Sequence, residues 1–394
     1  MANNMIIGQS GGPTRVINQS LIAAVKEAKK HPGIGKIFGM KHGILGAMNE
    51  DFIDFSEVSD EKLSVIAGTP GSALGSCRHK PSSDDCAKIF EVFKKNEIKY
   101  FFYIGGNDTA ETVHIINEIA VLNGYDLKAF HIPKTIDNDL CVTDHCPGYG
   151  SAAKYVAECF LGNELDNRAL KGVKIDIVMG RNAGWLTAAS ALARFEKDSG
   201  PHLIYVPEVP KSLDQVVAEI DEVVSRLGRC VVAVSEGIRG EDGELFAKKF
   251  SQEVDSHGNV QLSGSGALGD MLANHVKLNS KHEDLRVRTD TLGYAQRSYP
   301  DTVSEIDTQE AAGVGRAAVK FALGDHRSGS VYIKRLADDP YASEAKLTQL
   351  KNVAKVTKEM PREFMNEAGN FVSEEFLKYV KPIVGEMTEV GVLF

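Results

Sequence analysis

The sequence lacks the features of a membrane protein and of a small disulfide-stabilised secreted protein. No apolar run approaches the length of a membrane span, and residues 1–8 pass straight into a strand-like run without a signal peptide's hydrophobic region. The six cysteines include no Cys-x-x-Cys pair and no histidine at zinc spacing. We therefore expect a cytosolic protein with free thiols, and a bridge between Cys141 and Cys146, which flank a short polar loop, is the less favoured alternative.

The chain also lacks an excess of basic residues. Its 45 lysines and arginines against 54 acidic residues give a net charge of −9, which opposes non-specific binding to nucleic acid or to an anionic membrane. An anionic substrate must therefore meet a local basic patch. Repeats and Pro-rich linkers are absent too, and 394 residues exceed one usual core. We expect two domains between which the chain crosses more than once.

Short apolar runs alternate with longer amphipathic stretches, which is typical of an α/β layered fold with buried parallel strands. The expected strands are 4–7, 100–104, 129–132, 175–179, 203–206 and 230–234. The expected helices, with apolar residues three and four apart, include 16–29, 109–122 and 213–227. Residues 240–283 are polar and without a long periodic stretch, so we expect an insertion there, and the tail from 348 is mixed helical and charged.

Two glycine-rich turns follow expected strands and precede expected helices. They are Gly8-Gln-Ser-Gly-Gly-Pro-Thr14 and Gly105-Gly-Asn-Asp-Thr109, with Thr109 as the expected N-cap of the second helix. Backbone N–H groups and a helix N-terminus at such a turn bind phosphate. A structural turn that needs positive φ is the alternative for either one alone.

The segment Pro133-Lys-Thr-Ile-Asp-Asn-Asp139 follows an apolar strand and is dense in catalytic residue types. Phosphoryl transfer to an alcohol needs a carboxylate that takes the hydroxyl proton and cations that spread the charge on the moving group. We expect Asp137 and Asp139 on one side of an extended segment, with Lys134 beside them. An Asx-rich turn with a solvated lysine is the alternative.

Further charged residues follow later strands. Arg181 in Met179-Gly-Arg181 is suited to a phosphoryl group, and Glu208 and Glu236 to sugar hydroxyls. Arg288 and Leu292-Gly-Tyr-Ala-Gln-Arg297 offer two cations and a phenol for a sugar phosphate. Each of these residues, taken singly, is equally consistent with a plain surface position.

The order and spacing of these motifs resemble the phosphofructokinase family over roughly the first 300 residues. The similarity runs from Gly11-Gly12 through Thr135–Asp139 and Met179-Gly-Arg181 to Gln296-Arg297, and Gly75-Ser-Cys-Arg78 fits the family's phosphate loop. It implies two Rossmann-like domains with mainly parallel sheets, helices on both faces and an active site in the cleft between them. The implied donor domain is 1–145 with about 293–345, and the sugar-phosphate domain is 146–292 with about 346–394, with the insertion at 240–285.

The resemblance also implies a role for each matched residue. Asp137 is the expected base for the 1-hydroxyl of fructose 6-phosphate, assisted by Lys134, Arg181, Thr135 and Asp139. The implied donor-binding residues are Gly11, Gly12, Arg78, Gly106, Asp108 and Thr109, and Mg²⁺ is expected at Asp108, Asn107 and Asp137. The implied sugar-phosphate residues are Thr135, Met179, Gly180, Arg181, Glu236, Arg288, Tyr294 and Arg297. Arg288 would reach in from a neighbouring subunit, which implies a homodimer or a homotetramer.

Two charged residues indicate the phosphoryl donor. ATP-type members of the family carry glycine where this chain has Asp108 and Lys134. The Asp108 side chain would place bulk and negative charge where an α-phosphate must pass, and Lys134 would neutralise pyrophosphate and its leaving group. Lys41 stands roughly where an adenine-stacking aromatic is expected. The chain therefore resembles the pyrophosphate-dependent branch, which phosphorylates fructose 6-phosphate reversibly.

The sequence departs from the shorter family members at three places. Asn107 stands where a metal-binding aspartate is usual, Tyr294 replaces a histidine, and only Lys171 or Lys174 lies near the position of a second sugar-phosphate arginine. An ATP-dependent kinase of the same fold, an enzyme resembling NAD or lipid kinases, and a non-catalytic sugar-phosphate sensor remain the alternatives.

Overall fold

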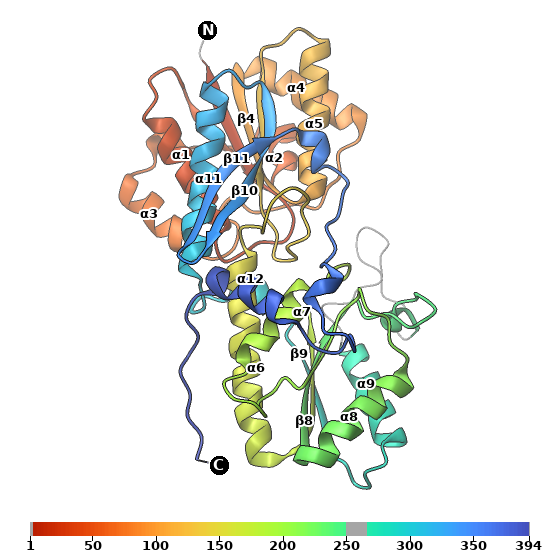
Figure 1. The fold of residues 1–394 in the computed structure, drawn as a ribbon. Coiled ribbons are helices and arrows are strands. Elements are labelled where there is room, and N and C mark those ends of the chain that lie inside the picture. Colours follow the sequence, from red (N-terminus) through yellow and green to blue (C-terminus); the bar gives the residue numbers. More distant parts are fainter. Residues whose placement is uncertain (1–2, 250–265, 394) are drawn as a thin grey trace. The chain divides into compact units, whose positions relative to one another are not determined.

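The computed structural model describes residues 3–249 and 266–393, which form two compact units (Figure 1). The first unit comprises Met1–Ser151 and Arg297–Lys358, and the second comprises Ala152–Gln296 and Glu359–Phe394. The chain therefore passes from one unit to the other after Ser151, after Gln296 and after Lys358. Each unit is an α/β layer built on a mainly parallel sheet, as the alternating pattern predicts.

The sheet of the first unit has seven strands. In spatial order they are β11 (Tyr341–Thr348), β10 (Ser328–Asp338), β5 (Lys128–Pro133), β4 (Ile98–Gly105), β1 (Asn4–Gln9), β2 (Ile37–Met40) and β3 (Phe52–Asp54). The central pairings are parallel, and only the edge strands β11 and β3 are antiparallel to their neighbours. The expected strands 4–7, 100–104 and 129–132 are thus confirmed.

Helices cover both faces of this sheet because its central strands alternate buried side chains between two cores. Phe102 and Ile104 of β4 pack in the core formed with helices α1 and α11, whereas Phe101 and Tyr103 pack in the core formed with α2, α4 and α5 (Figure 1). The helices are α1 (Ile17–Lys29), α2 (Ile44–Asn49), α3 (Asp60–Gly68), α4 (Ser83–Lys95), α5 (Asn107–Leu122) and α11 (Glu305–Leu323).

The sheet of the second unit has four parallel strands. Their spatial order is β7 (Leu203–Tyr205), β8 (Arg229–Ser235), β6 (Gly172–Val178) and β9 (Val287–Thr291). Val173, Ile175 and Ile177 of β6 pack against α8 and α9, and α6 lies on the other side of the sheet (Figure 1). The helices are α6 (Tyr149–Leu170), α7 (Trp185–Ala189), α8 (Leu213–Leu227), α9 (Ala267–Asn279), α10 (Ala295–Ser298) and α12 (Glu374–Val384).

Helix α8 shows how local sequence sets an element's ends. Ser212 and Gln215 form a reciprocal capping box at its start, and Gly228 adopts a left-handed conformation at its end. The expected helix 213–227 is confirmed for this reason. Short 3₁₀ turns complete the described chain as η1 (Phe55–Glu57), η2 (Ser190–Ala193), η3 (Phe246–Lys249), η4 (Leu350–Asn352) and η5 (Arg362–Phe364).

The expected insertion at 240–283 is only partly correct. Helix α9 occupies Ala267–Asn279 within it and buries Leu268, Leu272 and Val276 against the second sheet. Its apolar residues are spaced four apart, but the surrounding Gly, Ser and Asp masked that period. Residues 250–265 of this segment lie outside the described residues. Across residues 3–249 and 266–393, no helix is long and apolar enough to cross a membrane.

Candidate active site

The two glycine-rich turns of the first unit follow β1 and β4, which are adjacent strands. The chain proceeds from β1 to β2 on one side and later to β4 on the other, so the strand order reverses between β1 and β4. Ligands of open α/β sheets bind at the carboxyl ends of the strands at such a reversal. The fold therefore brings Gly11-Gly12 and Gly105-Gly106 to the position where a phosphate site is expected.

The first of these turns lies directly over a buried lysine. Lys134 is 4% exposed, and its Nζ donates a hydrogen bond of 2.7 Å to the carbonyl oxygen of Gly12. Gly11 has φ +73°, and a Cβ there would lie 3.2 Å from the same Nζ. A Cβ on Gly12 would lie 3.0 Å from Nε of Arg297. The positive φ favours glycine at position 11, and a side chain at position 12 would displace the Arg297 guanidinium.

The second turn opens helix α5, which begins at Asn107 with Gly106 as its N-cap. The expectation that Thr109 is the N-cap is therefore wrong. Thr109 is buried inside the first turn, where a Cβ on Gly105 would lie 2.1 Å from its Oγ1. Asp108 carries the charge of that first turn, and its side chain is 75% exposed, with Oδ1 3.8 Å from Nζ of Lys80.

The segment 133–139 after β5 is a hydrogen-bonded turn and not the expected extended run. Asn138 has φ +58°, and its Oδ1 accepts a hydrogen bond of 3.0 Å from the N–H of Cys146. Asparagine tolerates this left-handed conformation better than most residues. Oγ1 of Thr135 accepts from the N–H of Asp137 at 3.1 Å, and the N–H of Lys358 binds the carbonyl of Asp139 at 2.7 Å. These contacts hold the two carboxylates on either side of a fixed kink.

The charged groups of this region change one another's titration. Burial lowers the pKa of Lys134 to about 8, and the positive charges of Arg297 and Arg78 act in the same direction. Burial raises the pKa of Asp139 to about 7, and the neighbouring negative charge of Asp137 contributes. Three cations and two carboxylates therefore interact at the carboxyl end of this sheet, as a site for a highly charged anion requires.

The sequence also predicts a magnesium ion at this site. Among the residues that the structure describes, no group of three or more His, Cys, Asp or Glu side chains converges as a complete metal cage. Mg²⁺ in phosphoryl-transfer enzymes is usually held by one or two carboxylates together with substrate phosphates and water, so a complete cage is not needed. Burial is the main cause of the raised pKa of Asp139 and the charge of Asp137 adds to it, so a second carboxyl group lies close to Asp137. The residues present fit such an ion.

The second unit arranges its polar residues at the carboxyl ends of β6, β8 and β9. The N–H of Met179 donates to Oε1 of Gln296 at 3.2 Å, and the N–H of Gly180 donates to Oε1 of Glu236 at 3.4 Å. A Cβ on Gly237 would lie 2.1 Å from the carbonyl oxygen of Arg181, so the loops after β6 and β8 touch. The fold thus brings Met179, Gly180, Arg181 and Glu236 together, and Gln296, which the sequence places in a matched motif without a role, binds the backbone of Met179.

Two other residues predicted to bind the sugar phosphate lie at opposite ends of β9. Tyr294 follows the strand and is 49% exposed. Arg288 lies near its start, where Nη1 binds Asp166 at 2.8 Å, while Nε and Nη2 are buried without a hydrogen-bond partner in the described part of the chain. One chain therefore does not bring Arg288 and Tyr294 together. Glu208, considered for sugar hydroxyls, instead accepts from the backbone N–H groups of Gly184 and Met360.

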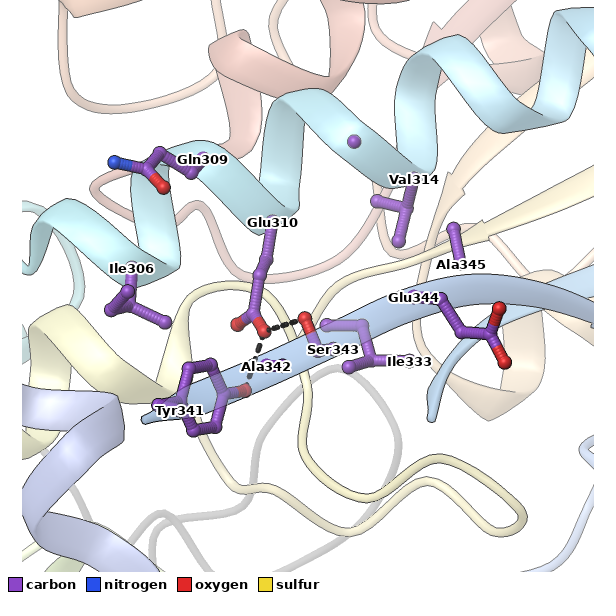
Figure 2. Close-up of a pocket in the computed structure, with 11 residues that line it drawn as sticks. Ile306, Gln309, Glu310, Val314, Ile333, Tyr341, Ala342, Ser343, Glu344 and Ala345 are labelled. Atoms are coloured by element: carbon purple, nitrogen blue, oxygen red, sulfur yellow. Dashed lines mark hydrogen bonds between the residues drawn. The ribbon is translucent and has the colours of Figure 1, made fainter. Parts of the chain in front are cut away.

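A separate pocket of the first unit, with a volume of about 360 Å³, lies between α11 and the β10–β11 hairpin (Figure 2). Glu310 points into it and accepts hydrogen bonds of 2.6 Å from Tyr341 and from Ser343. The same carboxylate binds Nε2 of the buried His145 at 2.5 Å, and Nδ1 of His145 binds Asp144 at 2.8 Å. This network ties the loop that follows the 137–139 turn to the hairpin.

The fold and this arrangement of glycine-rich turns, kinked carboxylates and basic residues define a phosphoryl-transfer enzyme of the phosphofructokinase type. The family model described as Phosphofructokinase matches residues 4–322, and the chain belongs to that family.

Relatives of known name narrow the comparison. The chain is 49% identical to "Pyrophosphate--fructose 6-phosphate 1-phosphotransferase" of Rhodospirillum rubrum over 97% of this chain and 94% of that protein. It is 38% identical to the protein of the same name from Halomonas elongata, over 97% and 92%. The solved pyrophosphate-dependent phosphofructokinase of Marinobacter aquaeolei is 34% identical, with a TM-score of 0.87 over 98% of this chain and 92% of that one.

Proposed function

We propose that this chain transfers a phosphoryl group between pyrophosphate and the 1-hydroxyl of fructose 6-phosphate, reversibly, forming fructose 1,6-bisphosphate. The observation that carries the proposal is Lys134, whose buried Nζ lies under the Gly11-Gly12 turn of the donor site. The names of the two relatives at 49% and 38% identity support the same reaction. A cytosolic step of glycolysis and gluconeogenesis fits both substrates.

We assign the donor to the first unit. Backbone N–H groups of Gly11, Gly12 and Gly106 and the N-terminus of α5 would bind the pyrophosphate oxygens, with Thr109 shaping the turn. Arg78 and Lys134 would neutralise the two phosphates. Positive charge held in place before the reaction lowers the barrier because it meets negative charge on the leaving phosphate without reorganisation.

Asp137 would take the proton of the sugar 1-hydroxyl as that oxygen attacks the nearer phosphorus. The hydrogen bond from its N–H to Thr135 and the kink at Asn138 fix the carboxylate's backbone. Thr135 and Arg181 would contact the moving phosphoryl group, and Asp139 would support Asp137. When bound, Mg²⁺ would neutralise phosphate oxygens. Asp108, Asn107 and Asp137 are the residues assigned to hold it.

We assign the sugar phosphate chiefly to the second unit. Met179, Gly180 and Glu236 would contact the sugar, and Tyr294 and Arg297 its 6-phosphate. Contacts place Arg297 itself in the first unit, beside Gly12. Arg288, remote along β9 from Tyr294, would serve the site of a second copy, and this supports a homodimer or a homotetramer.

The donor preference rests on physical size and charge. A lysine filling the space below the Gly11-Gly12 turn supplies positive charge that would neutralise a short, highly charged inorganic donor. Lys41, at the position where an adenine would need a flat apolar partner, is in an ion pair of 2.6 Å with Asp51. An ATP-dependent kinase of the same fold is the second candidate. A non-catalytic sugar-phosphate sensor would leave Asp137 without a task.

The test is a donor comparison with purified protein and Mg²⁺. Formation of the sugar bisphosphate is measured with pyrophosphate and with ATP, using fructose 6-phosphate and sedoheptulose 7-phosphate as acceptors. We expect turnover with pyrophosphate and at least 100-fold lower kcat/KM with ATP. Faster turnover with ATP would contradict the donor assignment, and binding of fructose 6-phosphate without turnover would favour the sensor.

A further inference from the structure

The first unit, to which we assign the phosphoryl donor, contains a completely buried histidine. His131 lies in β5, and its ring points to the core that also contains Tyr103 and Phe101. It contacts two polar groups from the neighbouring strands. Nδ1 lies 2.8 Å from Oγ of Ser330 on β10, and Nε2 lies 2.8 Å from the carbonyl oxygen of Gly105 at the end of β4. The ring therefore spans three strands at the level of the phosphate turn.

The partners fix which ring nitrogen carries the proton. A carbonyl oxygen only accepts, so Nε2 must donate to Gly105. Burial lowers the pKa of His131 to about 4, and although the bond to Gly105 opposes that effect, the nearby charge of Lys134 adds to it. The ring is neutral at pH 7, and Nδ1 accepts the hydroxyl proton of Ser330. One tautomer thus satisfies every polar atom of the ring.

The carbonyl of Gly105 also connects the two segments assigned to the phosphoryl donor, the turn at the start of α5 and the segment that contains Lys134. It accepts the backbone N–H of Lys134 at 2.9 Å in addition to Nε2 of His131. The next residue, Gly106, is the N-cap of α5. The hydrogen bonds to this one oxygen atom fix the peptide plane between Gly105 and Gly106, which leads into the N-terminus of α5. They also hold the backbone of Lys134, whose side chain lies under the Gly11-Gly12 turn.

A buried polar ring costs folding free energy unless both nitrogens are paired, and an apolar side chain would fill the same space without that requirement. The pairing that His131 makes with Ser330 joins two strands that already share ladder hydrogen bonds. Its pairing with Gly105 lies where the β4 ladder ends and the turn begins. The second contact is therefore the one that can affect the ligand site.

We propose that His131 is a positioning residue for the phosphoryl-donor site, and that its Nε2–H holds the Gly105 carbonyl so that the α5 N-terminus and Lys134 are placed together for the donor. The proposal rests on the proposed function, because it assigns the donor to these two segments. It predicts an effect on donor binding that spares the binding of the sugar phosphate.

Two amide substitutions separate the two contacts of the ring. The terminal amide of glutamine reaches about as far as Nε2, whereas that of asparagine reaches only about as far as Nδ1. We expect His131→Gln to keep KM for pyrophosphate within about threefold of the wild-type value, and His131→Asn to raise it about tenfold or more. KM for fructose 6-phosphate should stay within about twofold in both. Equal donor effects of the two variants, or equal effects on both substrates, would overturn the proposal.

Ser330→Ala is the matched control, since it removes the other partner of the ring and leaves the bond to Gly105 in place. We expect lower thermal stability with unchanged KM for pyrophosphate. A donor defect as large as that of His131→Asn would show that the ring acts through general stability and would overturn the proposal.

Amide hydrogen exchange of Lys134 supplies a readout without turnover. It should accelerate about tenfold or more in His131→Asn and little in His131→Gln, and unchanged exchange in both would overturn the proposal. If the wild-type enzyme used ATP and not pyrophosphate, the proposed donor would be wrong. The same KM comparison with ATP, and the exchange measurement, would still test the role of His131.

Discussion

At the scale of single residues, Lys134 combines its proposed role at the donor site with a cost to stability. Its pKa falls from 10.5 to about 8 because burial and two neighbouring cations disfavour the charge. The charged form is therefore destabilised in the folded state at pH 7, by about 3 kcal/mol at about 1.4 kcal/mol per pKa unit. A buried cation that opposes folding in this way fits the role that we propose for Lys134 at the donor site.

Replacing Lys134 by methionine should separate the two effects. We expect Lys134→Met to raise the free energy of unfolding at pH 7 by about 1–3 kcal/mol, because an apolar chain fills the space without a buried charge. It should lower kcat/KM for pyrophosphate about 100-fold or more. Urea unfolding and steady-state kinetics measure the two. Loss of stability together with unchanged kinetics would contradict this account of the site.

A double substitution tests the donor preference itself. We expect Asp108→Gly with Lys134→Gly to lower kcat/KM for pyrophosphate about 100-fold, because the positive charge of Lys134 is lost. We also expect slow turnover with ATP, because the bulk and negative charge of Asp108 are removed from the N-terminus of α5. The single variants assign the effect. Because the Asp108 side chain is 75% exposed, Asp108→Gly alone should change pyrophosphate kinetics less than Lys134→Gly. Unchanged pyrophosphate kinetics in the double variant would reject a role for both residues.

Single residues of the site were predictable where a motif carries them and unpredictable where packing does. Residue types alone were enough to find Asp137, Asp139 and Lys134, because the three charged residues follow the apolar strand β5 within one short segment. Two hydrogen bonds of the site join residues remote in sequence. One runs from the N–H of Met179 to Gln296, and the other from the N–H of Lys358 to the carbonyl of Asp139. The left-handed Asn138 also depends on a bond to Cys146, which no local pattern reveals.

At the scale of elements, the loop between β5 and α6 is held to the β10–β11 hairpin by charged hydrogen bonds. Burial alone would lower the pKa of His145, but its bonds to Asp144 and Glu310 raise it to about 9. A raised pKa contributes stability that is fully present below the unfolded value near 6.5 and is lost as pH rises through about 9. The loop behind the 137–139 turn is therefore held most firmly at mildly acidic pH, where His145 is protonated and Asp144 and Glu310 remain ionised.

The variant Glu310→Gln should reveal this contribution. We expect the wild-type protein to exceed the variant in free energy of unfolding by about 2–3 kcal/mol near pH 6.5, and by clearly less near pH 9.5. The lowered pKa of Lys134 makes the free energy of unfolding depend on pH in the opposite direction. This effect is the same in the wild-type protein and in the variant, so it cancels when their free energies of unfolding are subtracted. Urea unfolding across this range measures it, and Glu305→Gln on the exposed side of α11 is the control. A difference independent of pH would contradict the network.

The elements most readily predicted have both a clear period and local end signals, as in α8 with its capping box and terminal glycine. Helix α9 was missed because its apolar residues are few and lie in a polar setting, and it is stabilised by packing on the second sheet. The parallel strands were found because apolar runs mark them. Their spatial order follows from tertiary pairing and was not predicted beyond the α/β class.

At the scale of the whole molecule, each unit has its own sheet and its own cores. The proposed assignment of one substrate to each unit can therefore be mapped by hydrogen exchange. We expect imidodiphosphate with Mg²⁺ to slow exchange chiefly at 8–14, 105–109 and 134–139. Fructose 6-phosphate should slow it chiefly at 178–181 and 235–237. Protection of the second set by imidodiphosphate alone would contradict the assignment.

The central sheet of the first unit also has a consequence for synthesis of the chain. Strand β5 pairs on one side with β10, which follows it only after the chain between Pro133 and Ser328 has been made. At ribosomal rates that interval lasts on the order of ten seconds. Throughout it, the nascent β5 presents an open edge rich in apolar side chains, the kind of surface that chaperones cover. Slowing translation between Pro133 and Ser328 should lower the soluble yield of the enzyme. Slowing it earlier, before β1 (Asn4–Gln9) has a partner strand, should lower that yield less.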